Sequence, residues 1–230
     1  PSTSPWVTAM GGTTTFVALN NQIMLDSYGV PVNPVSNVVA SNETAWSNYG
    51  FVPYNINYGG GTGGISMFDP EPWYQAGITL PNPQPNGYPN GRMVPDVSFE
   101  ASPYPGGLFV FTNNTGTPLL GISGGTSESS PLFAGLVTLL DQYIGMRSRL
   151  LNPTIYAFGT NNSLYPKLFN PVTFGYNTPY VNSYGYNLVN GFGSINIGSF
   201  STYLKQYISS TSSLPFMMVT VTTSNPSHTT

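Results

Sequence analysis

The sequence has no cysteine, a single histidine and few charged residues, and each shortage argues against a class of chemistry. Without cysteine there is no disulfide framework, no thiolate nucleophile and no iron–sulfur cluster. The one histidine, His228, lies in a Ser/Thr-rich C-terminal stretch, which argues against a Ser-His-Asp triad and a histidine-ligated zinc site. Acid–base chemistry within the chain therefore depends on its eight carboxylates.

Charged residues make up 6% of the 230 residues, against about 25% in an average soluble domain. Only five are Lys or Arg, and none precedes Arg92, so the chain lacks the basic surface needed to bind nucleic acid or anionic lipid. No apolar run reaches the ~20 residues of a membrane helix, so we expect no membrane span.

Solubility must come from uncharged polar groups, because the formal net charge is only −3 and the isoelectric point is about 4.8. Such a surface suits an acidic environment, where carboxylates are protonated. We therefore expect a secreted protein that works in acid. A glycosylated extracellular protein at ordinary pH is the alternative, and Asn-x-Ser/Thr sites at Asn42, Asn113 and Asn161 fit both.

The pattern along the chain predicts a mixed α/β organisation. Residues 5–19 read as extended, and three short apolar runs at 94–97, 108–111 and 119–122 suit buried strands of a parallel sheet. A short helix is expected over 200–208, in addition to the longer one described below. Because the sequence opens at Pro1 with neither a basic start nor an apolar signal core, we expect a piece of a longer precursor. Residues 1–208 would belong to part of one domain and 209–230 to a Ser/Thr-rich tail.

The clearest predicted helix runs from about Ser127 to about Ile144. Glu128 near its start and Arg147 and Arg149 just beyond its end match the helix dipole. Its apolar residues recur at helical spacing and predict a broad buried stripe, made of Leu132, Phe133, Leu136, Val137, Leu139, Leu140, Tyr143 and Ile144.

The start of this helix carries the motif with chemical content, GGTSESSPLFAG at 124–135. Gly124 and Gly125 allow a tight turn and close approach of a substrate backbone. Ser127 then stands at a helix N-terminus, where free backbone N–H groups and positive potential favour a developing oxyanion. A bare Gly-Thr-Ser is more often a plain N-cap, but the longer pattern favours a nucleophile.

The motif resembles the nucleophile segment of the subtilisin-like superfamily, and within it most closely that of the sedolisins, the serine-carboxyl peptidases. Further blocks resemble the family in its own order over roughly residues 2–205. They are STSPWVTAMGGT at 2–13, ETAW at 43–46, TGGIS at 62–66, PWYQ at 72–75, VPDVS at 94–98 and GYNLVNGFGS at 185–194.

The resemblance implies a subtilisin-like α/β fold with a mostly parallel β-sheet flanked by helices, present here as the C-terminal portion of a larger domain. It implies that Ser127 is the catalytic nucleophile of an acid-acting endopeptidase. Peptide or protein substrates would contact Gly124 and Gly125, together with Gly63, Gly64 and Ser66. These assignments rest on the resemblance, since glycines also simply make turns.

The family's catalytic Glu and Asp, and its oxyanion Asp, lie upstream of the segment that matches Pro1. We therefore expect the base to come from an N-terminal segment of the same precursor, and the isolated chain to be inactive. None of its own acids takes these roles. Asp96 falls in a structural strand, and Glu128 is expected to be a solvated carboxylate at the helix start.

The family also has a calcium site with two aspartates, at positions held here by Pro171 and Asn187. Proline supplies no side-chain oxygen and asparagine only a neutral one, whereas calcium favours carboxylates. We therefore expect no metal cofactor. Two other functions stay open: a non-catalytic sedolisin-like structural or binding subunit of an extracellular assembly, and a β-rich adhesin, which explains the composition but not the ordered blocks.

Overall fold

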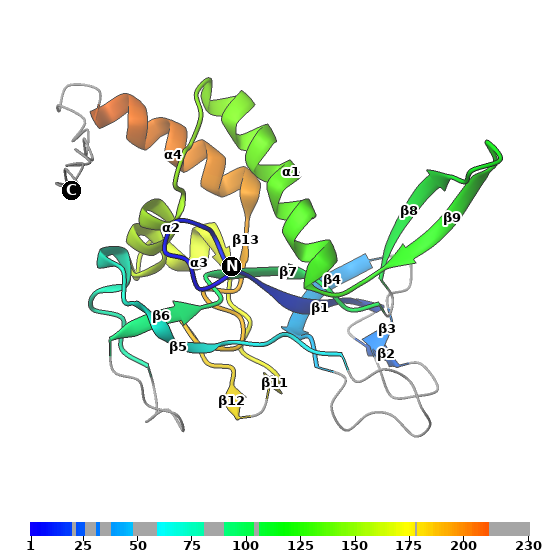
Figure 1. Cartoon of the computed structure of the whole chain (residues 1–230), viewed down its shortest axis with the longest axis horizontal. Helices are drawn as coiled ribbons and strands as arrows, with labels where there is room; N and C mark the ends of the chain where they lie inside the picture. The colour runs from blue at the N-terminus through cyan, green and yellow to red at the C-terminus, as the bar shows by residue number, and fades with distance from the viewer. Residues whose placement is uncertain are drawn as a thin grey trace, which may run out of the picture.

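The computed structural model describes residues 1–19, 22–25, 31–32, 38–47, 59–80, 90–103, 106–177 and 179–211 (Figure 1). The predicted tail falls almost wholly outside this part, and so does His228. The domain boundary at 208 therefore stays a prediction.

The largest sheet is built on β1 (Met10–Leu19). Strand β4 (Val38–Ala45) and β2 (Gln22–Leu25) pair with β1 in antiparallel fashion, β3 (Pro31–Val32) pairs with β2, and β7 (Val97–Glu100) runs parallel to β1. Among the described strands β1–β7 is the one parallel pair. The strand that we predicted at 94–97 is not formed as such, because Val94 ends the antiparallel strand β6 and only Val97 lies in the parallel strand β7.

Three short antiparallel pairs of strands lie outside this sheet. They are β5 (Gly64–Pro70) with β6 (Gly91–Val94), β10 (Phe169–Asn170) with β13 (Ser194–Ile195), and β11 (Tyr176–Asn177) with β12 (Tyr180–Val181). The strands β10 to β13 belong to the region in which the family's calcium site would fall.

The expectation that 108–111 and 119–122 form buried parallel strands is wrong. They form an antiparallel hairpin of β8 (Gly107–Thr112) and β9 (Pro118–Ser123) that projects away from the rest of the described chain (Figure 1). The connecting turn explains the reversal, because the Asn113 side-chain oxygen accepts hydrogen bonds from the backbone N–H of Thr115 at 3.0 Å and of Thr117 at 2.9 Å.

The helix expected at Ser127 is α1 (Thr126–Ile144), which ends at Gly145 in the left-handed conformation with φ of 79°. The second expected helix is longer than predicted, as α4 (Ile197–Thr211). Three short elements were not predicted: η1 (Trp73–Gln75), α2 (Asn152–Gly159) and α3 (Tyr165–Leu168). No helix in the described ranges is long and apolar enough to cross a bilayer.

The predicted stripe on α1 is only partly buried. Phe133 and Leu140 are buried in the core, but Leu132, Leu139 and Tyr143 are 45%, 59% and 48% exposed. The apolar surface of α1 is therefore wider than the face that the described chain covers.

The core beneath α1 and α4 is rich in aromatic rings. Phe192 is central to it, with ring centroids 5.1 Å from Tyr156, 5.7 Å from Phe169 and 5.2 Å from Tyr186. Such edge-to-face and tilted contacts add to the burial of apolar area.

A fully buried ion pair joins β6 to the start of β7. Both Arg92 and Asp96 have no exposed surface, and the guanidinium donates to the two carboxylate oxygens at 2.8 and 2.6 Å. The backbone N–H of Ala9 and the hydroxyl of Tyr156 also donate to this carboxylate. Although burial opposes the charged form, the hydrogen bonds and charge of Asp96 hold the pKa of Arg92 above its ordinary value. Asp96 is thus structural, as expected.

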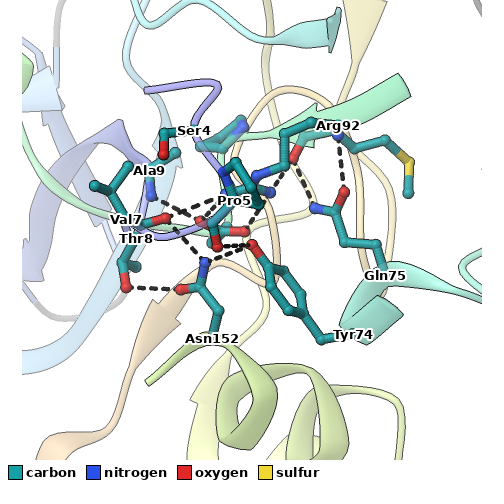
Figure 2. Close-up of polar contacts among 12 residues, drawn as sticks. Ser4, Pro5, Val7, Thr8, Ala9, Tyr74, Gln75, Arg92 and Asn152 are labelled. Atoms are coloured by element: carbon teal, nitrogen blue, oxygen red, sulfur yellow. Dashed lines mark hydrogen bonds and ion pairs between the residues drawn. The ribbon is translucent and has the colours of Figure 1, made fainter. Parts of the chain in front are cut away.

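The N-terminal segment is fixed by a neighbouring polar cluster, drawn in Figure 2. The buried amide of Asn152 donates to the Val7 carbonyl at 2.9 Å and to the Tyr74 hydroxyl at 3.0 Å, and accepts from Thr8 at 2.7 Å. The Tyr74 hydroxyl donates in turn to the carbonyl of Pro5. These bonds set the position from which the chain enters β1.

Candidate active site

Ser127 lies in the first turn of α1 with an exposed side chain. Gly125, with φ of 83°, makes the turn from β9 into the helix, and its carbonyl accepts from the backbone N–H of Glu128. Within the described residues neither the hydroxyl nor the backbone N–H of Ser127 has a hydrogen-bond partner. The Ser127 side chain does not cap the helix, so the plain N-cap role is not the one it takes.

The end of α1 that carries Ser127 is locked to the sheet by Ser129. This fully buried hydroxyl donates to the Gly11 carbonyl on β1 at 2.7 Å and accepts from the Phe99 N–H on β7 at 3.2 Å. The Gly125 N–H donates to the Ala101 carbonyl just after β7. The hydroxyl of Ser127 is therefore held on a fixed frame.

Trp46 packs beside this turn and was not singled out from the sequence. Its indole ring carbons lie 2.9 Å from the position that a Cβ on Gly12 would take, and 2.7 and 3.9 Å from those on Gly59 and Gly125. Its ring nitrogen is buried without a partner among the described residues. The ETAW block includes Trp46 but gives no signal of this packing, because the neighbours of the ring come from three distant segments.

The predicted substrate-contacting residues fall into two groups. Gly124 and Gly125 adjoin Ser127 in the turn, as expected from the chain. Gly63 and Gly64 open β5, where a Cβ on Gly63 would meet the Leu188 backbone oxygen at 1.8 Å. The Ser66 hydroxyl accepts from the backbone N–H of Phe68 at 3.2 Å and of Asp69 at 2.9 Å. No contact places this second group against Ser127, and its role stays a prediction.

The expectation that Glu128 is solvated is wrong, since its side chain is only 8% exposed. The carboxylate lies against the backbone of Gly107, where any Cβ would overlap it, and one of its oxygens is buried without a partner in the described part of the chain. The base of the β8–β9 hairpin covers it. That covering element was itself predicted wrongly, which is why the burial was missed.

Two more carboxylates, Glu100 and Glu43, are partly buried on strands of the large sheet. Burial raises the pKa of Glu100 above its ordinary value, against hydrogen bonds from the N–H groups of Thr15 and Ser102, and the charge of Glu128 raises it further. Burial also raises the pKa of Glu43, against hydrogen bonds from Ser194 and Thr13.

These raised pKa values predict that the protein is more stable in acid than at neutral pH. The native state keeps protons on Glu43 and Glu100 that the unfolded state has released, so the free energy of unfolding is highest below the ordinary glutamate pKa of about 4.3. As the pH rises through the raised pKa values, the free energy of unfolding falls. The slope is up to about 1.4 kcal/mol per pH unit for each proton that only the native state retains. Urea unfolding from pH 3 to pH 7 measures this, and Glu100→Gln should flatten the slope. A stability maximum at neutral pH would contradict it.

The region of the family's calcium site is closed by Asn187. Its side-chain N–H₂ donates to the carbonyls of Ser183 at 3.0 Å and Gly185 at 3.4 Å, while its oxygen accepts from the N–H groups of Val189 and Asn190. The carbonyls of Ser183 and Gly185 thus accept from an amide donor. With Pro171 as the other position, neither residue supplies the carboxylate that calcium favours, and the absence of a calcium site stays a prediction.

The solved structures include one with a similar fold. The chain matches Pseudomonas sedolisin, a serine-carboxyl proteinase complexed with two molecules of pseudo-iodotyrostatin, with a TM-score of 0.63 and 27% identity over 91% of this chain and 48% of that one. The fold is therefore subtilisin-like α/β, as expected, and corresponds to part of a larger domain.

Curated relatives give the family. Kumamolisin from Bacillus sp. (strain MN-32) is 32% identical over 177 residues, covering 77% of this chain and 26% of that protein. Sedolisin from Pseudomonas sp. (strain 101) is 31% identical over 211 residues, covering 89% and 30%. The chain belongs to the sedolisin family. It spans between a quarter and a third of the length of these two relatives, and no family model matches it.

Proposed function

We propose that the chain is the nucleophile-bearing part of an acid-acting serine-carboxyl endopeptidase. The observation that carries the proposal is the exposed and unpaired Ser127 at the N-terminus of a 19-residue helix that is anchored to the sheet. A serine kept free of local hydrogen bonds at such a place is available to a substrate and to a base from outside the described chain.

In the proposed mechanism the Ser127 hydroxyl oxygen attacks a peptide carbonyl and passes its proton to a carboxylate base. The carbonyl oxygen gains the negative charge, and the backbone N–H of Ser127 donates to it. The side chain of Glu128 is buried against Gly107 and has little access to substrate, so the neighbouring acid is not the base. The base comes from an upstream segment of the precursor, as the family resemblance implies.

A carboxylate base requires an acidic working pH to be matched to its task. Support comes from the low content of charged residues and from the partly buried Glu43 and Glu100, whose pKa values are raised above the ordinary value. We therefore place the protein outside the cell, in an acidic medium, with glycans on any of Asn42, Asn113 and Asn161. Hydrolysis of a denatured protein substrate at pH 3 by the chain joined to its upstream segment, absent at pH 7, tests the proposal.

We further propose that the protein folds without calcium, with the Asn187 amide in place of the ion. Asn187→Asp should lower the free energy of unfolding by about 1–3 kcal/mol, because a carboxylate cannot donate to the Ser183 and Gly185 carbonyls. Urea unfolding of the variant in EDTA measures the loss, with the exposed Asn114→Asp as the control. The wild-type midpoint should be the same in calcium and in EDTA; a higher midpoint in calcium would contradict calcium-free folding.

A non-catalytic assembly subunit is the second candidate, and the exposed apolar hairpin favours it. Such a protein would need neither a base nor a free Ser127. The two candidates differ in the sequence ahead of Pro1, where the peptidase requires a Glu and an Asp four residues apart on one helix.

A further inference from the structure

The β8–β9 hairpin presents an aliphatic face that nothing in the described chain covers. In its register Leu108 pairs with Ile122 and Val110 with Leu120, so the four side chains share one face. They are 69%, 63%, 70% and 69% exposed, respectively. A monomeric protein seldom leaves such a contiguous group of aliphatic side chains in water.

The opposite face of the hairpin is different, because its rings pack on one another. Phe109 and Phe111 stack with centroids 5.5 Å apart, and the Phe109 ring fills the space above Gly121. These two phenyl groups are each 44% exposed. The aliphatic side chains are therefore more exposed than the rings, and the aliphatic face is the better candidate for contact with a partner.

The hairpin that carries the aliphatic face leads directly into the turn before the candidate nucleophile. Strand β9 ends at Ser123, four residues before Ser127, and the hairpin and α1 diverge from this point (Figure 1). The outer stripe of α1 that contains Leu132 and Leu139 is also uncovered. The hairpin and α1, which meet at the turn before Ser127, thus each carry apolar side chains that the described chain leaves uncovered.

The comparison with Pseudomonas sedolisin offers one candidate for a covering polypeptide. This chain aligns over 91% of its own length but only 48% of the sedolisin chain, so about half of that structure has no counterpart here. No residue from Ala101 to Ser127 is charged. A partner of this hairpin would therefore need an uncharged, apolar surface.

We propose that the aliphatic face of the β8–β9 hairpin is the docking surface for the upstream segment of the same precursor, which brings the carboxylate base to Ser127. An isolated two-stranded hairpin is marginally stable in water, and docking supplies the packing layer that it lacks. Its free strand edges also allow the segment to extend the hairpin. This proposal deepens the proposed function and rests on it.

The test mixes the 230-residue chain with the separately expressed polypeptide encoded ahead of Pro1, and measures association by calorimetry. The variant Val110→Thr with Leu120→Thr should weaken binding at least tenfold. Val181→Thr is the matched control, since Val181 is a strand valine of 68% exposure against 70% for Val110; it should bind like wild type. Hydrogen exchange of the hairpin amides should slow in the complex.

Three results would overturn the proposal: equal binding by the hairpin variant and wild type, an encoded chain with no polypeptide ahead of Pro1, or a dimer of the chain alone that the hairpin variant dissociates. The Ser127→Ala chain should bind the segment as tightly as wild type. If a complex forms, depends on the hairpin and hydrolyses no peptide, the docking surface stands and the proposed function fails. If hydrolysis occurs and does not depend on the hairpin, the proposed function stands and the docking surface is wrong.

Discussion

Ser127→Ala should lower kcat/KM for peptide hydrolysis by ~10⁴-fold or more in the chain joined to its upstream segment. Removal of a serine nucleophile abolishes the covalent route, and only the slow reaction supported by binding and oxyanion contacts remains. Because Ser127 is exposed and makes no hydrogen bond within the described residues, the free energy of unfolding should not change. Steady-state rates at acidic pH measure the loss.

The matched control is Ser130→Ala, an exposed serine one turn further along α1. It should leave both the rate and the stability as they are. Activity that survives Ser127→Ala would remove the assigned nucleophile, and equal losses in the two variants would indicate damage to α1 rather than to catalysis.

Arg92→Met should produce the largest loss of stability, about 3–5 kcal/mol. The substitution leaves the Asp96 carboxylate fully buried with no positive charge beside it, held only by Ala9 and Tyr156. Since β6, β7 and the N-terminal segment meet there, the loss should appear as a lower midpoint in urea with little change in the slope.

Arg147→Met provides the comparison, because Arg147 is exposed beyond the end of α1. A surface substitution of this kind should change stability by about 0.5 kcal/mol or less. Similar losses in both variants would show that the buried pair contributes nothing beyond ordinary surface charge.

The start of α1 could be predicted to within one residue. Its glycine turn, acidic first turn and apolar spacing are all local signals, and they agree with one another. The nucleophile motif and the order of the family blocks are also local, and these led to the family that the comparisons confirm.

Features that depend on distant packing could not be predicted. A run such as Leu108–Phe111 reads the same whether it is a buried parallel strand or half of an exposed hairpin, because periodicity cannot separate them. The burial of Glu128 could not be predicted either, because it depends on Gly107 of the hairpin lying against its carboxylate. The short helices α2 and α3 begin with prolines at 153 and 166 and are too brief for a periodic signal.

Ser129 has a consequence for how the reactive group is carried. It lies two positions after Ser127, which is about 3 Å of helix rise, and it is hydrogen-bonded to two strands at once. The position of Ser127 is therefore set by the strands that hold Ser129 as well as by the helix itself.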